Sequence, residues 1–133
     1  ENRTLVLGAS LNPNRYSNIA IKRLLDKNFQ VVALGQKKGS VLGVLIDDEK
    51  KQYQNIDTVN LYLNPERQKE YYDYIVSLNP RRVIFNPGAE NDELVTLLES
   101  KNITAEVACT LVLLSIDQYW FYKNELDITK LRK

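Results

Sequence analysis

The chain has 133 residues, the size of one ordinary domain, and we expect residues 1–133 to form a single domain. Lysine and arginine together number 18, against 17 for aspartate and glutamate, and this balance argues against a nucleic acid partner. The absence of histidine and the single cysteine, Cys109, exclude histidine-based triads, most zinc sites and an internal disulfide, and they favour a cytoplasmic location.

The first third of the chain alternates between short apolar runs and polar segments. Residues 4–7 and 30–34 favour β-strands, and Gly8 and Gly35 end them. Between these runs, Ser17 is a suitable N-cap for a helix that continues to about residue 27. Residues 36–46 are predicted to be a loop that can hold a short extended piece.

The same alternation continues to residue 108. Residues 58–63, 82–85 and 104–108 are predicted strands. One helix begins at Asn64 and Pro65, and another is capped by Asn91. Pro80 is expected to end the first of these two helices.

The last part of the chain is aromatic and apolar. The longest apolar stretch, residues 108–116, is too short to span a membrane, so no membrane partner is expected. The tail, residues 117–133, contains the aromatic cluster 119–122. This segment can pack on its own domain, or it can form a homodimer interface, because aromatic residues are enriched at interfaces.

Strands that alternate with helices predict an α/β fold. We expect a Rossmann-like, doubly wound sheet of about five mainly parallel strands with helices on both faces. In such sheets, ligands bind beyond the carboxyl ends of the strands, where the strand order reverses. The loops after the first four strands are therefore the candidate site.

The loop after the first strand has the features of a phosphate-binding loop. Gly8 permits a sharp turn, and the small residues Ala9 and Ser10 allow a ligand to approach the backbone. The loop continues through Asn12 and Pro13 into a helix, whose first N–H groups have no partner within the helix and attract anions. Arg15 adds a guanidinium group that can bind phosphate oxygens in a bidentate manner.

Two features distinguish this loop from a typical NAD site. The dinucleotide pattern requires three glycines, but its positions hold Gly8, Ser10 and Pro13. NAD sites also place an acidic residue after the second strand. This chain has no acid there but a basic pair, in the order Gly35, Gln36, Lys37 and Lys38. A lysine pair favours a phosphorylated ribose, as in coenzyme A (CoA), and NADP fits almost as well by charge.

Several spaced motifs resemble those of a known family over about residues 4–110. They are Gly8-Ala9-Ser10-x-Asn12-Pro13-x-Arg15-x-Ser17, Lys37-Lys38-Gly39, Val41-Leu42-Gly43, Ile56-Asp57-Thr58-Val59 and Gly88-Ala89-Glu90-Asn91. Together they resemble the small stand-alone CoA-binding proteins, which are similar to the CoA-binding domain of the succinyl-CoA synthetase α subunit. The resemblance implies a Rossmann-like fold that binds CoA, without an agreed enzymatic activity.

The resemblance also implies positions for the ligand. Its pyrophosphate would contact Gly8, Ala9, Ser10, Asn12, Pro13 and Arg15. The adenosine phosphate would lie near Gly35, Gln36, Lys37 and Lys38, and Asn64 and Pro65 would flank the ligand.

Three functional hypotheses follow. The leading one is non-catalytic binding of CoA or an acyl-CoA, with NAD(P) binding as the alternative for the ligand. The second is an enzyme in which Cys109 attacks an acyl group, activated by a helix that begins near Thr110. The third is a regulatory or interaction protein with a vestigial nucleotide pocket and an aromatic tail as its interface.

Overall fold

The structure is a computed structural model and describes residues 3–119. One sheet contains all seven of the described strands, in the order β3-β4-β2-β1-β5-β6-β7. The strands are β1 (Arg3–Ala9), β2 (Gln30–Gly35), β3 (Gly39–Val41), β4 (Val44–Asp47), β5 (Ile56–Leu61), β6 (Arg82–Phe85) and β7 (Thr104–Val107). All neighbouring strands are parallel except β3 and β4.

The sheet has two more strands than the five expected from the sequence. The segment predicted to be a loop forms the antiparallel hairpin β3–β4 at one edge. Its turn residues, Leu42 and Gly43, have φ angles of +48° and +86°, as in the tight hairpin turns that match strand twist. Leucine is an unusual residue in that backbone region, so the sequence lacked the Asn-Gly signal that normally reveals such a hairpin.

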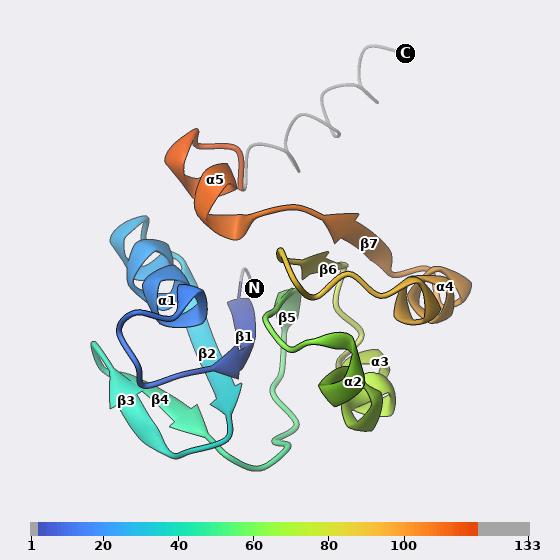
Figure 1. The fold of residues 1–133 in the computed structure, drawn as a ribbon, viewed down its shortest axis with the longest axis horizontal. Helices are drawn as coiled ribbons and strands as arrows, with labels where there is room; N and C mark the ends of the chain where they lie inside the picture. Colours follow the sequence, from blue (N-terminus) through green and yellow to red (C-terminus); the bar gives the residue numbers. More distant parts are fainter. Residues whose placement is uncertain (1–2, 120–133) are drawn as a thin grey trace.

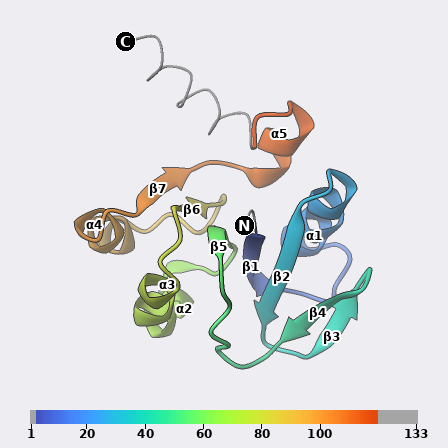
Figure 2. The same cartoon turned by 180° about the vertical axis from the view of Figure 1, so that it is seen from behind.

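The helices lie on both faces of the sheet, which makes the fold a doubly wound, Rossmann-like α/β architecture (Figure 1). The helices are α1 (Tyr16–Asp26), α2 (Pro65–Gln68), η1 (Lys69–Tyr71), α3 (Tyr72–Leu78), α4 (Asp92–Ser100) and α5 (Thr110–Ser115), where η1 is a 3-10 turn. α1 and α5 lie on one face, and α2, α3 and α4 lie on the other, as the view from behind also shows (Figure 2).

Two of the three predicted helix caps are confirmed. The Asn64 side chain accepts a hydrogen bond from the Arg67 amide at 3.0 Å, and the Asn91 side chain accepts one from Glu93 at 3.1 Å. The third was wrong, because Arg15 occupies the extended N-cap position and Ser17 is buried inside α1. The loop before α1 forms its own turn, so the N-cap of α1 lies two residues earlier than expected.

Alternating side chains of the central strand pack into two separate cores. Leu5 and Leu7 of β1 face α3 and α4, where Ile75 and Leu94 are fully buried. The other side of β1, including Val6, faces α1 and α5. This alternation is the period of two expected for a strand covered on both faces.

The face under α5 also contains a buried polar network around Arg82, which is only 1% exposed. Its guanidinium donates hydrogen bonds to the Thr58 hydroxyl at 3.0 Å and to the Tyr119 carbonyl at 2.8 Å, and it pairs with Glu106 at 3.1 Å. The Tyr119 hydroxyl lies 2.9 Å from the Thr4 hydroxyl. Tyr119 therefore packs within its own domain, whereas the other residues of the aromatic cluster, 120–122, lie outside the described residues.

Within residues 3–119, no helix is long and apolar enough to cross a membrane. The same residues contain no group of three or more His, Cys, Asp or Glu side chains that could hold a metal ion.

Candidate functional site

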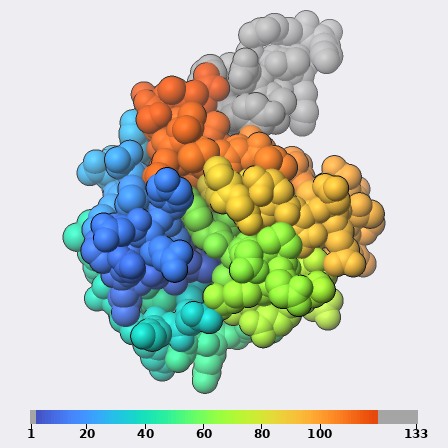
Figure 3. Space-filling view, viewed as in Figure 1, coloured from blue at the N-terminus to red at the C-terminus, as the bar shows by residue number. Residues whose placement is uncertain are grey.

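A pocket of about 790 Å³ lies beyond the carboxyl ends of the central strands. β1 pairs with β2 on one side and with β5 on the other, so the direction of winding reverses between β1 and β5. The pocket is lined by the segments that follow these three strands. In Figure 3, the blue segment after β1 and the green segment after β5 flank it. This is the position where doubly wound folds bind ligands.

Two glycines shape the floor of the pocket. Gly8 has a φ of +98° and sits at a shift in the β1–β2 register, so it bends the end of β1. A side chain on Gly35 would place its Cβ 2.2 Å from the carbonyl oxygen of Ala9. The ends of β1 and β2 can approach this closely only because position 35 has no side chain.

The loop between β1 and α1 is held by hydrogen bonds of its own. The amides of Asn12, Asn14 and Arg15 donate to the Ser10 hydroxyl, the Asn12 side chain and the Asn12 carbonyl, at 3.0, 2.9 and 3.0 Å. The Asn18 side chain donates to the Ser10 carbonyl at 2.9 Å. Fewer loop amides are therefore open to an anion than the sequence suggested. Tyr16 and Ser17, the first residues of α1, line the pocket, and a helix leaves its first N–H groups without intrahelical partners.

The charged residues that line the pocket are all basic: Arg15, Lys37 and Arg67. No aspartate or glutamate is among the described lining residues. The three cations come from three different segments, which follow β1, β2 and β5. With no acid to neutralise them locally, they favour an anionic ligand.

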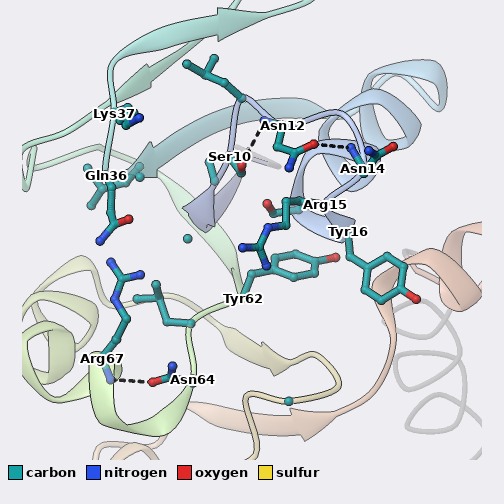
Figure 4. Close-up of a pocket in the computed structure, with 18 of the residues that line it drawn as sticks. Ser10, Asn12, Asn14, Arg15, Tyr16, Gln36, Lys37, Tyr62, Asn64 and Arg67 are labelled. Carbon is teal, nitrogen blue, oxygen red and sulfur yellow. Dashed lines mark hydrogen bonds between the residues drawn. The ribbon is translucent and has the colours of Figure 1, made fainter.

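Gln36 and Arg67 meet across one end of the pocket (Figure 4). With its amide oxygen turned toward the guanidinium, Gln36 accepts hydrogen bonds from Arg67 at 2.5 and 3.3 Å. Arg15, Tyr16 and Tyr62 lie toward the opposite end in the same view. The pocket thus has basic groups at both ends.

Tyr62 contributes a buried hydroxyl to the inner wall. Within the described part of the chain, this oxygen has no hydrogen-bond partner. Burial raises the pKa of Tyr62 well above its usual value near 10, so the group remains a neutral phenol at physiological pH.

The structure brings most of the sequence-predicted site residues together at this pocket. Those that line it are Gly8, Ala9, Ser10, Asn12, Arg15, Gly35, Gln36, Lys37 and Asn64. Pro13, Lys38 and Pro65 do not line it. Pro13 and Lys38 are exposed, and Pro65 occupies the first turn of α2 beside its cap.

Sequence reasoning missed several lining residues, including Tyr16, Tyr62, Arg67 and Pro87, and it named Gly88 only as part of a family motif. The available signal for Arg67 was its place in the segment that follows β5, one of the loops that the fold class selects as a candidate site. Cys109, the hypothetical nucleophile, is half-buried at the N-cap of α5 and is not among the lining residues.

The fold and the site together define a Rossmann-like protein with a basic pocket at the switch point of its sheet. The model of the CoA binding domain family matches residues 2–115, so the chain belongs to that family. No curated protein sequence matches the chain.

Solved structures agree with the fold. A crystal structure of an uncharacterized protein is 45% identical in sequence, with a TM-score of 0.86, and the match covers 89% of this chain and 98% of that one. A conserved hypothetical protein from Pyrococcus furiosus is 24% identical, with a TM-score of 0.74, over 84% of this chain and 98% of its own.

A larger enzyme contains the same fold. An acetyl-coenzyme A synthetase from Candidatus Korarchaeum cryptofilum, in complex with phosphate and ADP, is 14% identical, with a TM-score of 0.68. The match covers 82% of this chain but only 26% of the synthetase. The likeness therefore concerns the fold of one part of a longer chain.

Proposed function

We propose that this protein binds coenzyme A or an acyl-CoA, without catalysis of its own, in the pocket at the carboxyl ends of β1, β2 and β5. The observation that carries the proposal is the set of three lining cations with no acid beside them. Membership of the CoA binding domain family supports this ligand. CoA carries a diphosphate and a ribose phosphate, so a pocket that is basic at both ends suits it.

The diphosphate would lie against the loop between β1 and α1. Gly8 and Ala9 let the ligand approach the backbone, and the Ser10 hydroxyl can donate a hydrogen bond. Arg15 is exposed at the start of α1 and belongs to none of the ion pairs among residues 3–119. Its guanidinium would pair with the phosphate oxygens, supported by the first amides of α1.

The lining chemistry supports the non-catalytic assignment. The described lining residues include no thiol, carboxylate or imidazole that could act as a nucleophile or general base. The exposed side chain of Leu11 instead provides apolar surface for an adenine ring or a pantetheine arm.

Isothermal titration calorimetry with CoA, acetyl-CoA, NADP and NAD tests the proposal. We expect CoA and acetyl-CoA to bind and NAD not to bind. Arg15→Gln should weaken the binding of CoA by about tenfold to a hundredfold, since hydrogen bonds to charged groups contribute about 1.5–3 kcal/mol. The matched control is Arg23→Gln, because Arg23 is exposed on α1 and outside the pocket.

Binding of NADP without binding of CoA would overturn the choice of ligand. Turnover of acetyl-CoA by the purified protein would overturn the non-catalytic assignment. Mass spectrometry of small molecules retained by natively purified protein provides an independent test of the same ligand.

A further inference from the structure

We propose that Arg67 recognises a phosphate monoester on the ribose of the bound nucleotide, beside Lys37, which the family resemblance already places near that phosphate, and that Arg67 sets the preference for CoA over dephospho-CoA. This inference rests on the proposed function, because it concerns one end of the same pocket. It assigns a specificity-determining role to a residue of α2 that the sequence had not singled out.

The first argument is position. Lys37 follows β2 by two residues, and in doubly wound folds the end of the second strand of the unit faces the ribose of a bound nucleotide. Arg67 comes from α2, but its guanidinium reaches Gln36 at 2.5 Å. Arg67 is therefore placed at the ribose end by its contact with the residue next to Lys37.

The second argument is uncompensated charge. Among residues 3–119, the ion pairs involve Lys27, Lys51, Lys69, Arg81 and Arg82, and neither Arg67 nor Lys37 takes part in one. The nearest acid along α2, Glu66, pairs with Lys69 at 3.5 Å. The partner of Arg67 is the neutral amide of Gln36.

The third argument is orientation. A guanidinium group binds a phosphate through two parallel N–H bonds, provided that its plane is held in the right direction. Gln36 holds two N–H groups of Arg67 from the β2 side of the pocket. Since an amide adds no charge, it orients the guanidinium without neutralising it. A phosphate dianion can then replace the amide or bind beside it.

The chemistry also distinguishes this end from a site for an unmodified ribose. A free ribose diol is usually held by an acidic side chain after the second strand. Here the corresponding segment contains Gln36 and Lys37, and no described lining residue is acidic. Arginine and lysine side chains bind a doubly charged phosphate monoester better than they bind the two hydroxyl groups of a free ribose.

Titration calorimetry of the full chain with CoA and with dephospho-CoA tests the inference. The two ligands differ only by the ribose phosphate, so the ratio of their dissociation constants isolates this end of the pocket. We expect wild-type protein to prefer CoA by about tenfold or more, as one charge-assisted contact implies. Arg67→Gln should reduce this ratio to about one to threefold and leave dephospho-CoA affinity within about twofold of wild type.

Arg23→Gln is the matched control and should change neither affinity. A urea unfolding curve for Arg67→Gln checks that the variant is folded. A variant that loses affinity for both ligands equally, or that keeps the wild-type ratio, would overturn the role of Arg67.

The proposed function and this inference fail in different ways. If wild-type protein binds both ligands with equal affinity, the proposed CoA binding is supported, but recognition of the ribose phosphate by Arg67 is wrong. If it binds neither, the proposed function itself is wrong, and the inference falls with it. NADP and NAD, compared in the same way, show whether the pair accepts a 2′-phosphate as well as a 3′-phosphate.

Discussion

The carbonyl oxygen of Ala9 lies so close to Gly35 that a Cβ on residue 35 would sit 2.2 Å from it. Both residues are at the carboxyl ends of neighbouring parallel strands, and both line the pocket. The contact involves the backbone of β1 rather than a flexible side chain, so it cannot be relieved by a rotamer change. The depth of the pocket at this point therefore depends on one glycine.

Gly35→Ala should accordingly destabilise the fold and impair the site. We expect the free energy of unfolding to fall by about 3 kcal/mol, at the upper end of ordinary overpacking costs, because the strands must separate. Urea denaturation measures this change. Ser40→Ala, on the exposed side of β3, serves as the control and should stay within about 0.5 kcal/mol of wild type. An unchanged midpoint for Gly35→Ala would contradict the close approach.

Salt should reveal the ionic character of the ribose end. Raising sodium chloride from about 50 mM to about 500 mM should narrow the affinity ratio between CoA and dephospho-CoA, because screening weakens charge pairs in a solvent-accessible pocket. The two ligands share every other group, so nonspecific salt effects cancel in the ratio. A ratio independent of salt would indicate that the ribose phosphate makes no ionic contact with Lys37 or Arg67.

Arg82 should be essential for stability, although it lies outside the pocket. Its buried guanidinium bridges Thr58 and Glu106 and holds the carbonyl of Tyr119. Arg82→Met removes this charge and leaves the Glu106 carboxylate, whose side chain is 16% exposed, without its cationic partner. We expect a loss of about 3–5 kcal/mol in the free energy of unfolding. The exposed Arg23→Met should cost less than about 0.5 kcal/mol, and a similar small loss for Arg82→Met would refute the prediction.

Tyr119 should make stability sensitive to alkaline pH. Burial raises the pKa of its hydroxyl above the usual value of 10.0, so the folded protein keeps this proton at pH values where the unfolded chain has lost it. The unfolded state then binds fewer protons than the native state, and the free energy of unfolding falls as the pH rises above about 10. Each such proton contributes a slope of about 1.4 kcal/mol per pH unit.

Tyr119→Phe removes this titration together with the hydrogen bond that Asn60 donates to the hydroxyl at 2.8 Å. We expect a loss of about 1–3 kcal/mol at neutral pH and a shallower decline above pH 10 than in wild type. Urea unfolding at several pH values measures both effects. Parallel curves for the two proteins above pH 10 would exclude Tyr119 as a source of the alkaline sensitivity.

Strong local signals made the central part of the fold predictable. The runs that became β1, β2, β5 and β6 are largely apolar and bounded by turn residues, which is the pattern of strands covered on both faces. β7 lies at the edge of the sheet and is partly exposed, and its position after a capped helix made it predictable. The caps at Asn64 and Asn91 were predictable because a capping side chain bonds within its own turn. The hairpin β3–β4 was not, because its turn uses Leu42 in a backbone region that leucine rarely adopts.

The fold class, the succession of the main strands along the chain and the glycine at the end of β1 could all be predicted from the amino-acid sequence. Each of these depends on residues close together in the chain, whose preferences can be added along it. The contact of Arg67 with Gln36 after β2, and the packing of Tyr119 against Arg82, became visible in the folded chain alone. Those contacts join segments far apart in the sequence, and a linear pattern contains no information about which of several cations or aromatic rings the sheet will bring to a given place.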